Sequence, residues 1–170
     1  MVAQITSDAK EVLTTTYLEM RSPAELHRKR TDDRFQVREL KARDWRFNRD
    51  LYRRVGEAWR WFDKRAWSDA QWQEYGLASE LRTFAAYFED QLAGYYELRV
   101  DGDGGIEIAY FGLLSEFIGR GLGGALLTSA IEQAWAMSPA RVWVHTCNRD
   151  HPQALANYQA RGMSIFKIES

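Results

Sequence analysis

The sequence predicts a mixed α/β fold in which helices flank a mostly antiparallel sheet. Three strand-like runs follow one another over residues 81–114 with only short turns between them, which favours antiparallel pairing. Helix-like and strand-like runs then alternate from residue 117 to the C-terminus. A cluster of four glycines at 119–124 joins a strand-like run to a helix-like run, and the rest of the chain is organised around it.

The first half of the chain mixes strand and helix patterns. A run that includes the β-favouring Tyr17 predicts a short strand at 15–20, and alternating apolar and polar residues predict one at 35–40. The charged segment between them is typical of a solvent loop or short helix. Asp44 is predicted to cap a long helical section that continues to Phe62, and Ser68 or Asp69 to cap a second short helix. Residues 1–13 carry little pattern, so we expect the extreme terminus to be poorly ordered.

The second half gives the clearer pattern. Strands are predicted at 81–88, 92–100 and 106–114, with an Asp-Gly and Gly-Gly turn before the third. A helix over 125–135 has Leu122, Leu126, Ala130 and Ile131 on or near one face, so it can pack on a sheet. A strand at 141–146, a helix over 152–162 that starts at Pro152 and ends at Gly162, and a last strand at 163–168 complete the chain.

Composition limits the possible functions. With 170 residues, we expect one domain over 1–170. The net charge is −1, which argues against nucleic acid as a partner, although the basic cluster at 27–30 keeps that reading and a contact with phosphates open. One cysteine and three scattered histidines indicate no metal site and no disulfide framework. No signal-like or membrane-spanning run is present, so we expect a cytoplasmic protein that does not bind a membrane.

The glycine cluster predicts an anion site. A strand, a glycine loop and a helix start present several backbone N–H groups at the positive end of a helix dipole, which suits a phosphate or pyrophosphate. The Walker loop is excluded because the cluster runs on into Ala125 and Leu126 without a Lys-Ser/Thr pair. The Rossmann fingerprint fits poorly because the preceding strand belongs to a meander.

The same run resembles motif A of the GNAT acetyltransferase superfamily, Arg/Gln-x-x-Gly-x-Gly/Ala, which binds the pyrophosphate of acetyl-CoA. Ile118 stands where the family usually has Arg or Gln, so backbone amides and Arg120 are left to hold the phosphates. The resemblance implies a splayed sheet and acetyl-CoA as co-substrate. The implied cofactor-binding residues are Leu113, Leu114, Ile118, Gly119, Arg120, Gly121, Leu122, Gly123, Gly124 and, as an alternative to capping the nearby turn, Asn148.

Two further stretches are similar to this family. Ala154, Tyr158 and Gly162 match its C-terminal motif, while His151 and Met163 depart from it, and the match implies that Tyr158 protonates the departing thiolate of CoA. Glu107 has the spacing of the general base in the histone-acetylating branch, where a carboxylate with a raised pKa accepts the amine proton. The alternative is that Glu107 is a surface carboxylate of an alternating strand, with Tyr110 on the opposite face.

The aromatic excess has two interpretations. In the GNAT fold the helices after the first strand form the wall of the acceptor cleft, so Trp59, Phe62, Trp67 and Trp72 become candidates to bind an amine through cation–π contact, as do Trp61 and Tyr75. The alternative for each of them is packing against the sheet.

The resemblance therefore implies an N-acetyltransferase that moves an acetyl group directly to a primary amine of a small molecule or peptide. The alternative is a catalytically silent module that binds acyl-CoA or has a regulatory role, which the departures at Ile118 and His151 keep open. Cys147 beside His145 could instead carry the acyl group, but no third group that would orient them is visible in the sequence. Exposed strand edges and the aromatic excess are compatible with a homodimer.

Overall fold

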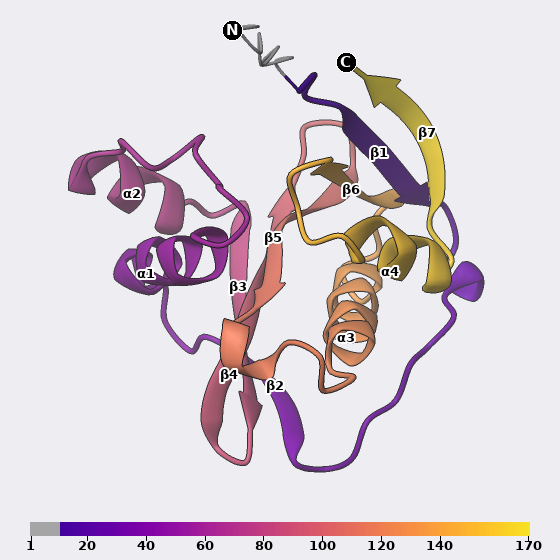
Figure 1. Cartoon of the computed structure of the whole chain (residues 1–170), viewed down its shortest axis with the longest axis horizontal. Helices are drawn as coiled ribbons and strands as arrows, with labels where there is room; N and C mark the ends of the chain where they lie inside the picture. The colour runs from indigo at the N-terminus through magenta and orange to yellow at the C-terminus, as the bar shows by residue number, and fades with distance from the viewer. Residues whose placement is uncertain (1–10) are drawn as a thin grey trace, which may run out of the picture.

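The computed structural model describes residues 11–170, which form one seven-stranded sheet with helices on both faces (Figure 1). The strand order is β2-β3-β4-β5-β6-β1-β7, and every neighbouring pair is antiparallel except β5 and β6. This arrangement confirms the predicted fold class. The expectation for residues 1–13 falls mainly on residues 1–10, which lie outside the described residues.

The predicted strands are all present, with ends that differ by one residue at most. They are β1 (Thr15–Met20), β2 (Phe35–Glu39), β3 (Leu81–Phe88), β4 (Gln91–Val100), β5 (Gly105–Leu113), β6 (Arg141–Cys147) and β7 (Ser164–Glu169). The helices are α1 (Trp45–Gly56), α2 (Asp69–Gly76), α3 (Gly123–Trp135) and α4 (Ala154–Ala160), with short 3₁₀ turns at Pro23–Glu25 and Ser115–Phe117. Both predicted caps are confirmed, because Asp44 accepts from the Arg46 N–H and Ser68 from the Gln71 N–H.

Two predicted helices are longer than the observed ones. The helix predicted to reach Phe62 stops at Gly56, where the Trp61 N–H donates to the Gly56 carbonyl over 3.1 Å and turns the chain back. A Cβ at position 56 would lie 2.7 Å from the Trp61 Cβ, so only glycine allows this close return. The last helix begins at Ala154 rather than Pro152, because the His151 ring accepts from the Gln153 N–H and holds the preceding residues in a turn.

Helices cover the two faces of the sheet at different places. α3 and α4 pack on one face over β1 and β3 to β6, with Leu126, Ala130 and Ile131 fully buried there, as their spacing predicts. α1 and α2 cover the opposite face of β3 to β5 with two smaller apolar clusters. Figure 1 shows the two helix pairs on opposite sides of the central strands. The end of β5 therefore emerges between two helical layers.

A β-bulge in β5 changes the direction of the side chains toward the end of the strand. Leu98 pairs with Ile108 and Glu97 pairs with Tyr110, so Ala109 is the additional residue of the bulge. Glu107, opposite Arg99, and Tyr110, opposite Glu97, therefore lie on the same face of the sheet. The expectation from simple alternation, which placed them on opposite faces, is wrong because the bulge shifts the period by one residue.

Gly162 fixes the end of α4, and its substitution tests this junction. Its φ is +103°, and a Cβ there would lie 2.0 Å from the Glu25 carbonyl oxygen. We expect Gly162→Ala to lower the free energy of unfolding by about 2 kcal/mol or more, since both the backbone conformation and the contact oppose a side chain. Thermal unfolding should then shift down by roughly 4–8 °C. Gly102→Ala, where a Cβ would meet nothing within 4 Å, is the matched control and should change little.

Candidate active site

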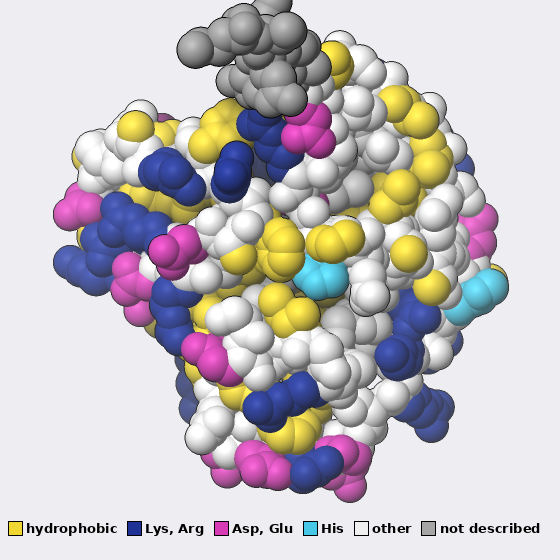
Figure 2. All heavy atoms as spheres, viewed as in Figure 1, with side chains coloured by type: hydrophobic (Ala, Val, Ile, Leu, Met, Phe, Trp, Pro, Cys, Tyr) yellow, Lys and Arg dark blue, Asp and Glu magenta, His cyan; other side chains and the backbone are white. Residues whose placement is uncertain are grey.

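The cavity follows from the way β5 and β6 separate. The two parallel strands pair at only three positions, Gly105–Glu107 with Arg141–Trp143, and then diverge. A cavity of about 870 Å³ opens between them, lined by the remainder of β5 on one side and by His145 and Cys147 on the other. Backbone groups of β5 that would otherwise pair with β6 therefore face this space. Figure 2 shows hydrophobic side chains gathered over the middle of this face of the molecule.

The glycine loop forms one end of the cavity. Gly119 and Gly121 have φ values of +82° and +76°, a backbone conformation that glycine alone adopts without strain. No described side chain caps the start of α3, so the N–H groups of its first turn keep their capacity to bind a ligand. Ile118, Leu122, Gly123 and Gly124 also line the cavity. This geometry can bind an anion, as the sequence predicts.

Two cations from outside the loop converge on it. A Cβ at Gly124 would lie 2.5 Å from the Lys29 Cδ and 2.7 Å from the Arg161 Nη1, so both side chains cross directly over it. Arg161 Nε and Nη1 are buried, and neither has a hydrogen-bond partner within residues 11–170. Buried donors without partners are uncommon in folded proteins, which marks this place as one that accepts a ligand.

Hydrogen bonds hold the basic cluster at residues 27–30 against α3 and the end of α4. The His27 N–H donates to the Arg161 carbonyl, and the Lys29 N–H donates to Thr128 Oγ1 of α3 over 3.0 Å. Arg28 pairs with Glu132 on the same helix. Of the two readings of this cluster, the structure favours the one in which it can contact phosphates. The position of Arg161 directly before the motif glycine Gly162 was the available signal in the sequence.

Three of the residues expected to bind the cofactor lie elsewhere. Arg120 points away from the cavity and lies over the rings of Phe88 and Phe117. Leu114 is buried, and its N–H donates to the Ala93 carbonyl, so this N–H is not available to a cofactor. Its neighbour Leu113 does line the cavity. The Asn148 side chain binds the backbone at Val12 and Thr14, as a residue that holds the N-terminal segment, and is absent from the cavity wall.

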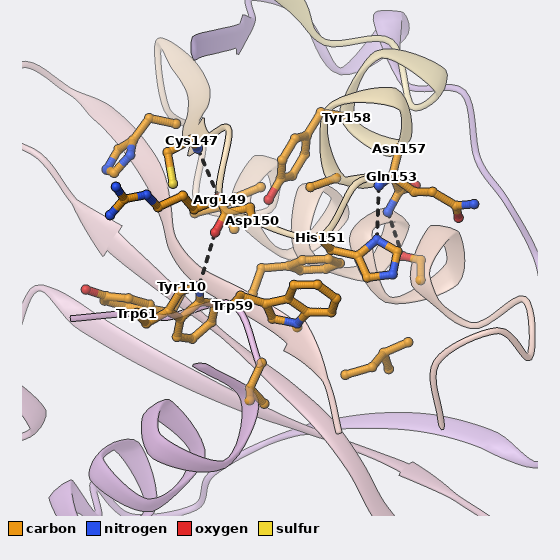
Figure 3. A pocket seen from close by; sticks show the side chains of 18 of the residues that line it. Trp59, Trp61, Tyr110, Cys147, Arg149, Asp150, His151, Gln153, Asn157 and Tyr158 are labelled. Carbon is orange, nitrogen blue, oxygen red and sulfur yellow. Dashed lines mark hydrogen bonds between the residues drawn. The ribbon is translucent and has the colours of Figure 1, made fainter. Parts of the chain in front are cut away.

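Tyr158 lies where α4 meets the middle of the cavity. The residue is almost fully buried, and its hydroxyl points toward Asp150 in Figure 3. Burial raises the pKa of Tyr158 well above its usual value, and the negative charge of Asp150 adds to this effect. The hydroxyl therefore keeps its proton at physiological pH and can donate it inside the cavity.

Asp150 connects the two halves of the molecule across the cavity. Its carboxylate accepts from Thr146 Oγ1 and the Cys147 N–H on its own side, and from Trp61 Nε1 on the α1–α2 side over 3.1 Å. Next to it the rings of Trp59 and His151 meet edge to face, with their centroids 4.8 Å apart (Figure 3). The loop after α1 is thus joined to the loop after β6, and the two loops bridge the space between the diverging strands.

Glu107 occupies the cavity wall in an environment different from the expected one. Its side chain is only 4% exposed, Arg99 pairs with it, and His145 Nε2 lies 3.5 Å away. Burial acts to raise the pKa of Glu107, but the hydrogen bonds with His145 and Arg99 outweigh it and leave the pKa below its usual value. The expected raised pKa is therefore wrong, because the sequence did not show which hydrogen-bond partners surround this carboxylate. Its role as a base stays a prediction.

The aromatic residues divide into two groups. Trp59, Trp61 and Phe62 line the cavity. Trp72 is 1% exposed and belongs to the core beneath α1 and α2, and Trp67 packs on it at the edge of a separate shallow depression. Neither Trp67 nor Trp72 reaches the cavity, so for these two the packing interpretation holds.

A lysine of the chain lies among three aromatic rings, two of which, Trp67 and Tyr75, were candidates to bind a substrate amine. Lys64 Nζ lies 4.6–5.0 Å from the ring centroids of Trp67, Tyr75 and Tyr110. It also donates to the Tyr110 hydroxyl over 2.9 Å and pairs with Asp63. Asp63 accepts from Tyr52 and Tyr110 as well; partial burial acts to raise its pKa, but these donors and Lys64 leave it lowered.

The described part of the chain contains no group of three His, Cys, Asp or Glu side chains arranged to hold a metal ion. Within the same residues, no helix has the length and apolar character needed to cross a membrane.

Comparisons with known proteins place this geometry in a family. The sequence profile of the Acetyltransferase (GNAT) family matches residues 36–163. No match was found among curated proteins. A GCN5-related N-acetyltransferase from Sphaerobacter thermophilus superposes with a TM-score of 0.72 at 15% identity, over 92% of this chain and 50% of that one. This chain therefore spans about half the length of that protein.

Two further solved structures are similar along most of their own length. An aminoglycoside acetyltransferase from an uncultured soil metagenomic sample, in complex with trehalose, has a TM-score of 0.62 at 16% identity, over 76% of this chain and 88% of that one. A Bacillus subtilis acetyltransferase in complex with CoA has a TM-score of 0.60 at 22% identity, over 78% of each chain. At these identities the structures establish the fold, and the profile match over most of the sequence establishes the family. The chain belongs to the GNAT family of acetyltransferases.

Proposed function

We propose that this protein is an acetyl-CoA-dependent N-acetyltransferase that transfers the acetyl group directly to a primary amine. The observation that supports this most strongly is the composition of the cavity. A glycine loop with two convergent cations lies at one end, a buried tyrosine lies at the middle, and an aromatic wall lies at the other end. A cavity of about 870 Å³ is large enough for a drug-sized ligand.

The residues at the loop fit the phosphates of acetyl-CoA. The N–H groups at the start of α3 provide backbone donors, and the unpartnered nitrogens of Arg161 together with Lys29 provide charge. These two cations replace the side chain that Ile118 lacks. The free backbone of β5 up to Leu113 would hold the extended pantetheine arm in the manner of an added strand.

The side chains around the middle of the cavity provide proton transfer. When bound, acetyl-CoA supplies a thioester whose acyl group can pass to an amine. Tyr158 holds a proton at its hydroxyl, which is the group needed to neutralise a departing thiolate. Asp150 and the ring contacts beside it cover this region, which limits the access of water.

For the amine proton we propose the pair formed by Glu107 and His145. Both side chains line the cavity, but that of His145 is 47% exposed and that of Glu107 only 4%, so the imidazole is the more accessible group for an amine. Glu107 then orients and supports the imidazole rather than meeting the substrate itself. The reaction needs one copy of the chain, and the expected homodimer stays a prediction.

The first prediction for this function concerns acetyl-CoA binding. We expect Arg161→Gln and Lys29→Gln each to weaken binding of acetyl-CoA by about 10- to 100-fold, since each removes a charge-assisted contact with a phosphate. Arg120→Gln removes an arginine from the same loop that does not line the cavity, and should bind normally. Calorimetric titration of each variant, after its thermal unfolding has been checked, measures the effect. Equal affinities in all three variants would contradict the assignment of the phosphate end.

The second prediction separates the enzyme from the silent module. Tyr158→Phe should keep the affinity for acetyl-CoA and lose about 100-fold in turnover, since only the proton donor is removed. Release of free thiol in the presence of an amine panel measures turnover. Tyr87→Phe, which changes a tyrosine on β3 that does not line the cavity, serves as the control. Tight binding of acetyl-CoA by the unmodified protein without thiol release for any amine would support the silent module instead.

A further inference from the structure

We infer that the acceptor is an amine that also carries a carboxylate on an apolar or aromatic body, as in an apolar α-amino acid, rather than a polycation such as a polyamine or an aminoglycoside. The inference rests on the proposed function and names its substrate class. An open aromatic wall lies in the same cavity as two arginines that have no carboxylate partner within residues 11–170, and this juxtaposition points to this class.

One aromatic ring at the acceptor end already binds a cation of the chain. Lys64 and Tyr110 both line the cavity, and Lys64 Nζ lies over the Tyr110 ring. Asp63 pairs with the same Lys64. A polycation that entered here would meet the positive charge of Lys64.

The other two carboxylates of the cavity are also satisfied. Glu107 pairs with Arg99, which lines the same space, and has His145 on its other side. Asp150 accepts from a tryptophan N–H, a threonine hydroxyl and a backbone N–H. No unpaired carboxylate in the described part of the cavity therefore remains to attract several positive charges.

Two arginines of the cavity wall have no carboxylate partner in the described part of the chain. Arg60 and Arg149 line the cavity, and neither forms an ion pair with a carboxylate within residues 11–170. In Figure 3, Arg149 extends past Cys147, on the side opposite Gln153 and Asn157 of the α4 region. Asn157 binds the Gly123 carbonyl, so Arg149 lies away from the phosphate end. Arginine is the side chain best suited to bind a carboxylate with two hydrogen bonds.

The wall beside these arginines is apolar and uncovered. Phe62 is 57% exposed, and Trp59 and Trp61 lie half-buried next to it on the same loop. Figure 2 shows Lys and Arg side chains beside hydrophobic ones over the α1–α2 part of this face. A flat apolar side chain can cover the rings while its carboxylate meets the arginines, and the amine then lies toward Tyr110 and the centre of the cavity.

Matched pairs of acceptors test the inference. L-Tryptophan is compared with tryptamine and L-phenylalanine with phenethylamine, which differ only by the carboxylate, and spermidine and sisomicin represent polycations. We expect kcat/KM for each amino acid to exceed that of its decarboxylated partner by about tenfold or more, mainly through KM, because a charge-assisted contact is gained. The polycations should be poorer acceptors than the amino acids, since Arg60 and Arg149 carry the same sign of charge as these ligands.

Arginine variants test which residues bind the carboxylate of the acceptor. Arg149→Gln together with Arg60→Gln should reduce the amino acid preference about tenfold while the rate with tryptamine changes little. Arg65→Gln alters an exposed arginine on the same loop that does not line the cavity, and should leave the preference intact. Calorimetric titration of acetyl-CoA accompanies every assay.

The possible outcomes distinguish this inference from the proposed function. A protein that does not bind acetyl-CoA would overturn both. A protein that binds acetyl-CoA but prefers spermidine or sisomicin, consumes neither member of any pair, or keeps its preference in the double variant would overturn the acceptor class alone.

Discussion

The separation of β5 from β6 after three paired positions is the constraint on which the rest of the site depends. Parallel strands that stop pairing leave backbone donors and acceptors facing an open space, and such groups need partners. The space is closed at one end by the glycine loop that follows β5, and its sides are held by α3, α4 and the loop after α1. One divergence of two strands thus creates both the ligand-binding backbone and the cavity around it.

Charge is divided along this cavity. At the loop end, Lys29 and the two unpartnered nitrogens of Arg161 supply positive charge where the usual motif side chain is replaced by Ile118. At the other end the carboxylates of Asp63, Glu107 and Asp150 are paired with Lys64, with Arg99 and with N–H donors. The family's loop is thus combined with cations supplied by other segments, and this can conserve an activity while a motif residue changes.

Local sequence determined much of the fold. Turn residues, strand alternation and helix caps act over a few residues, so the strands, the Asp44 and Ser68 caps and the glycine loop could be predicted. The GNAT assignment followed from short motifs for the same reason. Tyr158, Leu113 and most of the glycine loop lie on the cavity wall, where the motifs imply they should be.

Tertiary structure decided what depends on distant segments meeting. The bulge at Ala109 brought Glu107 and Tyr110 to one face, and hydrogen bonds from Arg99 of β4 and His145 of β6 lowered the pKa of Glu107. Packing buried Trp72 and turned Arg120 away from the cavity, while α4 and the segment before β2 brought Arg161 and Lys29 to the glycine loop. These contacts join residues far apart in the chain, so no local pattern encodes them, and only the packed sheet and helices specify the charge and shape of the site.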